Sequence, residues 1–215
     1  METNISFLAG TALALGTLHT LAGPDHYLPF IAMSRSRKWS MLKTVNIVAL
    51  CGLGHVLSSI IIGFIGIGAG IAISGIEKIE SSRGNVAAWL LLIFGLGYMF
   101  WGLYRLWKKH PHEHDHMKGD KKKMTFWILF TIFIFGPCEP LIPILMYPAA
   151  EHNYGAVAYI SILFAASTIL TMIAVVVLMT KGISIIKFNL LEKYQHVLAG
   201  AAISLCGAGI VFLGL

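Results

Sequence analysis

Six long apolar stretches, separated by shorter polar segments, dominate the pattern of residues along this chain. They cover residues 5–22, 42–73, 86–107, 125–147, 155–180 and 196–214. Each is near or above the ~20 residues that an α-helix needs to cross the hydrocarbon core of a membrane. None shows the strict alternation of a membrane β-barrel strand, so the pattern predicts six transmembrane helices.

The composition agrees with a membrane-embedded chain. Of the 215 residues, 57% are hydrophobic and 12% are charged, which leaves too little polar surface for a soluble fold. The first stretch follows Glu2 and Asn4 rather than a basic segment, so we expect it to stay as a helix and not to be removed as a signal peptide. A soluble enzyme is excluded, no membrane-protease motif occurs within a span, and we expect no enzyme activity.

The basic residues predict the orientation in the membrane. Cytoplasmic loops are enriched in lysine and arginine, and only Lys78 and Arg83 fall in the segments that follow the second and fourth stretches. We therefore expect both termini outside the cytoplasm, in the plasma (inner) membrane, with the lipid bilayer as partner and no nucleic acid. The other fourteen basic residues follow stretches one, three and five: Arg35, Arg37, Lys38, Lys43, Arg105, Lys108, Lys109, Lys118, Lys121, Lys122, Lys123, Lys181, Lys187 and Lys193.

A short motif occurs twice, 113 residues apart. Gly23-Pro24-Asp25-His26 in the first half corresponds to Gly136-Pro137-Cys138-Glu139 in the second, and the apolar residues that follow keep the same spacing. Three spans per copy is an odd number, so the second copy must cross in the opposite direction. The fold class predicted is an all-α polytopic membrane protein with a 3+3 inverted repeat. Its units are residues 1–104 and 125–215, joined by a His/Lys-rich cytoplasmic loop at 105–124.

The two Gly-Pro pairs predict breaks in the first and fourth helices. Proline removes a backbone donor and disfavours the helical conformation of the preceding residue. Gly23-Pro24 and Gly136-Pro137 should therefore bend or unwind their helices. The alternative is an ordinary kink that aids packing. In secondary transporters with inverted repeats, broken helices often form the binding site near the bilayer midplane.

Ionisable side chains collect near these breaks. Such groups cost roughly 2.5–3.5 kcal/mol each inside a membrane, so they indicate a functional site. Imidazole, carboxylate and thiol donors together suit nickel, cobalt or zinc. Asp25 and Glu139 could instead cap the broken helix ends, and His55, between Gly54 and Ser58, could be an interhelical hydrogen-bonding residue. The candidate metal ligands are His19, Asp25, His26, His55, Cys138 and Glu139.

A second group of metal donors lies between the third and fourth stretches. Four histidines alternate with other residues there, namely His110, His112, His114 and His116. The tract predicts accessory metal binding on the cytoplasmic side, and a solvated loop of mixed charge is the alternative. The three cysteines, Cys51, Cys138 and Cys206, fall in different spans, so no disulfide framework is expected.

These motifs resemble those of known metal carriers. His19, followed after five residues by Asp25-His26, resembles the first signature of the nickel/cobalt transporter family, in which the spacer has four residues. Gly-Leu-Gly-His55 and Gly-Pro-Cys138-Glu139-Pro are similar to motifs of the small six-span UreH-like or sulfite-exporter-like relatives in the LysE-type superfamily. The resemblance implies transport of a divalent metal, with nickel or cobalt as leading substrates, and covers both halves of the chain.

The sequence therefore predicts a secondary transporter of nickel, cobalt or zinc, with no permanent cofactor and with the metal ion as substrate. No Gly-x-x-x-x-Gly-Lys-[Ser/Thr] motif for ATP is present. Export of a small anion such as sulfite is one alternative. A membrane thiol-disulfide carrier is another, although the repeat equivalent of Cys138 is Asp25. Glycines such as Gly63, Gly66 and Gly70 could support a homo-oligomer.

Overall fold

The computed structural model describes residues 2–108, 118–185 and 193–214, and within these ranges it is helical without any strand. Five of the described helices are long and apolar enough to cross a membrane. The expectation of an all-helical protein embedded in a lipid bilayer is confirmed to that extent. These helices are α1 (Glu2–Ala22), α3 (Met41–Gly68), α4 (Ile73–Trp107), α7 (Tyr154–Ile185) and α8 (Gln195–Leu213).

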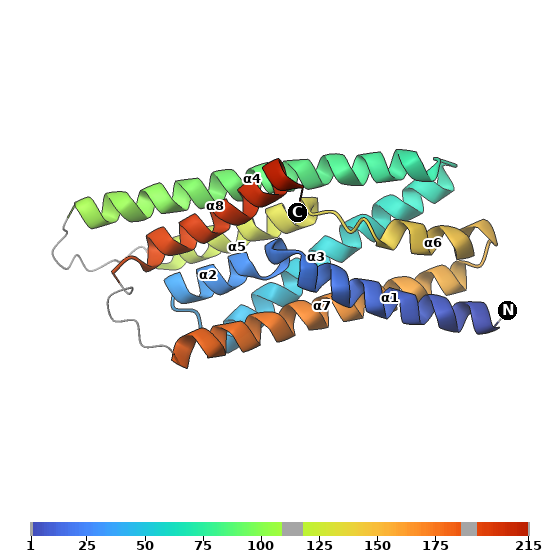
Figure 1. The fold of residues 1–215 in the computed structure, drawn as a ribbon, viewed down its shortest axis with the longest axis horizontal. Coiled ribbons are helices and arrows are strands. Elements are labelled where there is room, and N and C mark those ends of the chain that lie inside the picture. Colours follow the sequence, from blue (N-terminus) through green and yellow to red (C-terminus); the bar gives the residue numbers. More distant parts are fainter. Residues whose placement is uncertain (1, 109–117, 186–192, 215) are drawn as a thin grey trace.

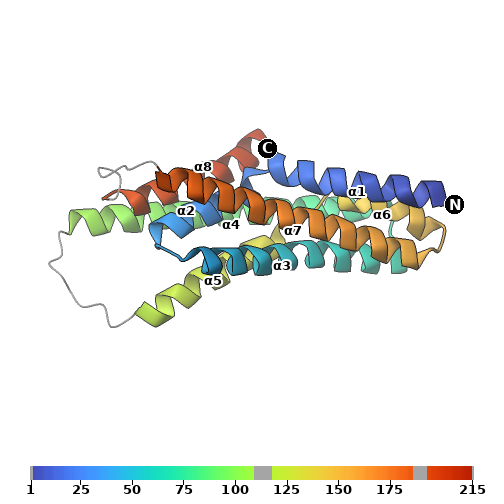
Figure 2. The same ribbon diagram turned by 90° about the horizontal axis from the view of Figure 1, so that it is seen from below.

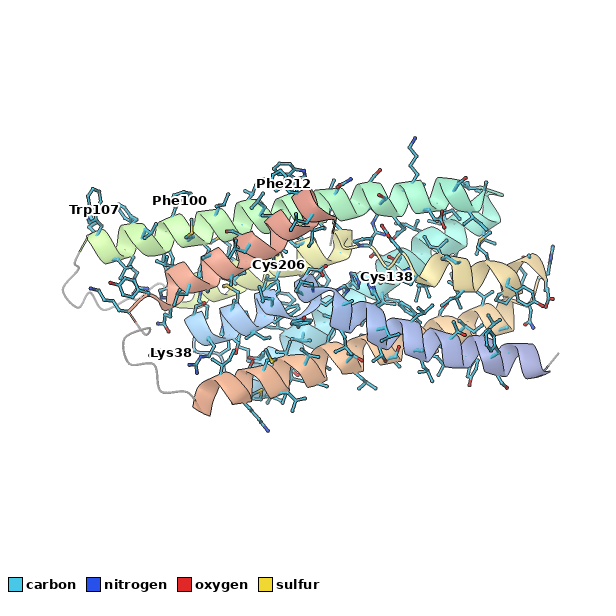
Figure 3. All side chains as sticks on the ribbon, in the orientation of Figure 1. Lys38, Phe100, Trp107, Cys138, Cys206 and Phe212 are labelled. Carbon is cyan, nitrogen blue, oxygen red and sulfur yellow. The ribbon has the colours of Figure 1, made fainter. Side chains whose placement is uncertain are left out.

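The helices run roughly along the long axis of the molecule (Figures 1 and 2). The N-terminus lies at one end of this axis, and the C-terminus lies about midway along it. Large apolar side chains cover the outside, as a lipid-facing surface requires. Phe100, Trp107 and Phe212, labelled in Figure 3, are 60%, 92% and 70% exposed.

The first Gly-Pro pair separates helix α1 from helix α2 (Leu28–Ser36). Helix α1 ends at Ala22, directly before Gly23, whose backbone is extended. Pro24–His26 then form a short 3₁₀-helix, η1, and α2 continues toward the opposite end (Figure 1). Pro24 is well suited to the first position of η1, because a residue there does not need to donate a backbone hydrogen bond.

The second Gly-Pro pair interrupts another helix. Helix α5 (Lys118–Phe135) ends directly before Gly136, and α6 (Leu141–Ala150) begins after Pro140. The apolar parts of these two helices, Met124–Phe135 and Leu141–Ala150, are each too short to cross a membrane alone. Figures 1 and 2 show both interruptions near the middle of the long axis.

Several expected boundaries differ in the structure. Helix α4 begins at Ile73, so Lys78 and Arg83 lie on a helix and not in a loop between the second and third spans. Polar residues had indicated a loop there, but an i,i+3 ion pair between Glu80 and Arg83 supports the helix. The predicted loop 105–124 is shorter, because α4 continues to Trp107 and α5 begins at Lys118. The tract from His110 to His116 lies outside the described residues.

Glycines allow α4 and α8 to pack closely. A Cβ added at Gly207 would lie 2.6 Å from the backbone nitrogen of Leu92. One added at Gly102 would lie 2.9 Å from the backbone nitrogen of Val197. At Gly200 the added atom would overlap the backbone of Met99. Small residues that let two helix backbones approach are typical of membrane-helix interfaces.

The close contact between α4 and α8 predicts that one added methyl group destabilises the fold. Gly200→Ala should lower stability by about 1–3 kcal/mol, because the helices must separate to make room. Gly97→Ala is the matched control, since Gly97 lies on α4 with no atom within 4 Å of an added Cβ. Thermal unfolding in detergent, followed by tryptophan fluorescence, checks the prediction. Equal unfolding temperatures for the two variants would show that the interface does not depend on close backbone contact.

Candidate metal centre

Three histidines meet where the first broken helix contacts α3. His19 lies in the last turn of α1, His26 ends η1, and His55 lies in the middle of α3. One ring nitrogen from each falls within 4.8 Å of the others. On an unbroken helix, His19 and His26 would lie about two turns apart. The turn at Gly23-Pro24 brings their ring centroids to 4.6 Å.

His55 is fixed by the end of α5. Its Nδ1 lies 3.2 Å from the carbonyl oxygen of Phe133, so Nδ1–H donates and Nε2 carries the lone pair. The thiol of Cys138 lies 3.0 Å from this Nε2 and donates to it. His55 is 2% exposed. A histidine held through Nδ1, with the lone pair on Nε2, has the orientation typical of a metal ligand.

His26 is held in the same way by its own turn. Its Nδ1 lies 3.1 Å from Asp25 Oδ1 and 3.2 Å from the carbonyl oxygen of Gly23. Both oxygens are acceptors, so Nδ1–H donates and Nε2 is left with a lone pair. A carboxylate on the far nitrogen of a ligating histidine fixes the ring and increases its basicity. Asp25 is thus placed to orient His26.

The two Nε2 atoms face each other at 3.3 Å. Two lone pairs at that distance repel unless a proton or a cation lies between them. Two imidazoles on one tetrahedral ion, with metal–nitrogen bonds of 2.0–2.1 Å, would have nitrogens about 3.3 Å apart. His19 Nε2 is buried and has no hydrogen-bond partner among the described residues. His19 Nε2 is therefore an open nitrogen donor, and the Nε2 atoms of His26 and His55 lie beside it with only each other and the Cys138 thiol as partners in the described part of the chain.

The six sequence-predicted ligands do not all occupy equivalent positions. His19, His26 and His55 form the group, and Cys138 is adjacent through His55. Asp25 contacts His26 at Nδ1, the nitrogen that does not face His55. Glu139 is exposed and lines the neighbouring cavity without joining the group. Coordination of one ion by all six residues stays a prediction.

A cavity of about 490 Å³ adjoins the histidines. Its wall comes from the two helix breaks, from α4 and from the end of α8. Polar lining side chains include Asp25, Ser81, Asn85 and Glu139. The cavity therefore brings a few polar side chains close to the three rings within a mostly apolar lining.

A buried ion pair at the second break was missed by sequence reasoning. Glu80 on α4 is fully buried and forms an ion pair with Arg83. The hydroxyl of Ser59 donates to Glu80 Oε2 over 2.8 Å. The sequence signals were the one-turn spacing of Glu80 and Arg83 and the Ser58-Ser59 pair in the preceding apolar stretch. Arg83 had instead been assigned to a loop, and Glu80 had been given no role.

This network holds the backbone of the interrupted helix. The amide of Cys138 donates to Glu80 Oε2 over 3.1 Å and contacts Ser59 Oγ at 3.2 Å. Arg83 Nη2 donates to the carbonyl oxygens of Ile134 at 2.5 Å and Gly136 at 3.4 Å. Backbone groups freed by the Gly-Pro break are thereby satisfied inside the protein, as membrane depth requires. The same bonds set the position of Cys138 beside His55.

Comparison with models of protein families, with curated proteins and with solved structures gives no match.

The network predicts that Glu80 is a structural requirement of the site. Glu80→Gln removes one charge of a buried pair, which costs about 3–5 kcal/mol, and weakens the hold on Cys138. Glu77→Gln is the matched control, because Glu77 is exposed on the same helix. Thermal unfolding and the rate of Cys138 labelling by a membrane-permeant maleimide, in a Cys51→Ala/Cys206→Ala background, check both effects. If the Glu80 and Glu77 variants unfold and label alike, the network does not hold the break.

Proposed function

We propose that this chain is a secondary transporter that moves a divalent transition-metal cation across the membrane through the three-histidine centre. Nickel and cobalt are the leading substrates, with zinc as a third. The observation that carries the proposal is the pair of Nε2 atoms on His26 and His55, oriented by separate acceptors and 3.3 Å apart, with the unpartnered His19 beside them.

The donor set favours a borderline transition metal. Neutral imidazoles suit nickel, cobalt and zinc, whereas magnesium and calcium prefer shells of oxygen. The thiol of Cys138 adds a soft donor next to His55 when it gives up its proton. Asp25 and Glu139 bring negative charge to the same cavity, which offsets part of the cost of holding a cation inside the membrane.

Transport, and not permanent storage of the ion, fits the position of the donors. They lie at interruptions of two helices, next to a cavity, and they come from elements that are not joined by continuous helix. A conducting site must bind its ion without holding it too tightly. Three neutral ligands with one adjacent thiol form a weaker site than a closed set of thiolates.

The order of elements supports the larger architecture that we propose. A broken helix followed by two long helices occurs first as α1–α2, α3 and α4, and again as α5–α6, α7 and α8. We infer that α5 and α6 together make the span that the five long helices lack. The result is six spans in a 3+3 inverted repeat. Both termini would lie outside the cytoplasm, in the plasma membrane, with the basic loops inside.

Flux into proteoliposomes tests the function. Wild-type protein should take up nickel, cobalt or zinc, each offered separately. Asp25→Asn should reduce the rate of uptake at least tenfold, because His26 loses the carboxylate that orients it. Loss of such a partner typically lowers metal affinity or activity by about 10–100-fold. Glu139→Gln should reduce the rate by lowering the negative charge of the cavity.

The controls separate this proposal from its alternatives. Glu151→Gln is the matched carboxylate control, since Glu151 is exposed at the far end of α6. Sulfite is offered as the anion substrate in parallel. Uptake of sulfite without uptake of any cation would overturn metal transport and assign the chain to anion export. Intact protein that binds metal but moves none would make it a metal receptor.

Cobalt(II) absorption tests the ligands directly. A nitrogen-rich, four-coordinate site gives cobalt intense visible bands, whereas six-coordinate cobalt in water absorbs weakly. His55→Asn should abolish these bands, and Cys138→Ser should remove only sulfur-to-metal charge transfer in the near ultraviolet. His152 is an exposed histidine whose side chain bonds to the carbonyl of Ala150, so His152→Asn should leave the spectrum unchanged. Bands that survive His55→Asn would place the metal elsewhere.

A further inference from the structure

A cationic cluster lies at the end of the molecule where α2 and α4 finish and α8 begins. It consists of Arg37, Tyr98, Trp101, Arg105 and His196, and we refer to it as the Arg37–Arg105 cluster. Arg37 directly follows α2, Arg105 lies in the last turn of α4, and His196 lies in the first turn of α8. None of these residues belongs to the metal centre.

Two guanidinium groups share the same aromatic surface. Arg37 Cζ lies 5.3 Å from the ring centroid of Tyr98 and 5.5 Å from that of Trp101. Arg105 Cζ lies 5.6 Å from the ring centroid of Trp101. Stacking on aromatic faces holds each guanidinium plane while its N–H donors at the edge remain available.

His196 and two hydroxyls complete the cluster. The hydroxyl of Tyr98 lies 2.9 Å from His196 Nδ1 and 3.2 Å from Ser36 Oγ. Arg105 Nη1 lies 3.5 Å from His196 Nε2. Cationic and neutral donors from three helices therefore converge on one place.

The described part of the chain supplies no counter-charge. Within residues 2–108, 118–185 and 193–214, no carboxylate lies within 4.0 Å of a guanidinium nitrogen of Arg37 or Arg105. Arg37 Nε is moreover buried and has no hydrogen-bond partner there. A buried donor of a charged group without an acceptor is costly. Within the described residues, the cluster thus has no anion that accepts from the two arginines.

Exposed aromatic residues indicate the depth at which the Arg37–Arg105 cluster lies in the membrane. Tyr104 is 57% exposed, Trp107 is 92% exposed and Tyr194 is 44% exposed, all beside the cluster in sequence and on the same helix ends. Tryptophan and tyrosine are enriched at the level of the lipid headgroups. A phosphate group is the anion found at that depth, and arginine binds phosphate through two parallel hydrogen bonds.

We propose that the Arg37–Arg105 cluster binds the headgroup phosphate of an anionic phospholipid. The guanidinium edges bind the phosphate oxygens. The net negative charge of the lipid offsets part of the positive charge of the two arginines, whereas a zwitterionic lipid has no net charge to offset it. Binding joins the ends of α2, α4 and α8 at the membrane surface. The proposal does not depend on metal transport.

Native mass spectrometry of the full chain in detergent tests the site. Phosphatidylglycerol, phosphatidylcholine and inorganic phosphate are titrated separately. Wild-type protein should bind phosphatidylglycerol at least about tenfold more tightly than phosphatidylcholine. Arg37→Gln/Arg105→Gln should lose about tenfold or more of that affinity, because two charge-assisted contacts are removed. The single Arg105→Gln variant, at an exposed position, gives a second readout if the double variant does not fold.

A matched double variant controls for charge alone. Arg35→Gln/Lys108→Gln removes two exposed positive charges from the ends of the same helices, α2 and α4, and should keep wild-type binding. Equal loss in both double variants, or no preference for phosphatidylglycerol, would overturn the proposal. Saturable binding of inorganic phosphate that excludes the lipid would also overturn it and assign the site to free phosphate.

Discussion

Hydrogen bonding of backbone groups at the two helix breaks is the constraint on which the rest of the structure depends. A membrane interior offers no water to an open amide or carbonyl. The first break resolves this locally, since the amides of Gly23, His26 and Tyr27 find carbonyl partners within the same turn. At the second break the amide of Cys138 has no such partner and instead donates to Ser59 and Glu80 from other helices.

The arrangement of the candidate metal centre follows from the way these backbone groups are satisfied. His26 Nδ1 donates to the carbonyl of Gly23 at the first break. His55 Nδ1 donates to the carbonyl of Phe133, one turn before the second. Each ring is thus held by the backbone of a different break, and both lone pairs turn toward the space between them. Two unwound segments and two histidines on separate helices therefore make one site, without a dedicated ligand loop.

Local features of the sequence predicted the apolar helices and the interruptions, because hydrophobic length and proline act within a few residues. Other features depend on helix phase and were not predictable. Glu77 and Glu80 look alike in sequence, but only Glu80 points into the contact with α3 and the second break. Asp25 was predicted as a ligand beside His26, whereas its carboxylate contacts the nitrogen opposite the shared space. Such roles depend on side-chain direction, which spacing does not fix.

The two breaks differ in how they balance charge, and this difference bears on which of them can move. The first carries its own carboxylate and imidazole in adjacent residues, Asp25 and His26. The second depends on Glu80 and Arg83, whose bonds reach the backbone on both sides of Pro137. Hydrogen bonds therefore join α4 to the α5–α6 break. The hydrogen bonds of the η1 turn to Gly23 and Asp25 stay within the first break. A rearrangement that opens the site would separate η1 from α3 more readily than it would release Cys138, because only the latter exposes a buried ion pair.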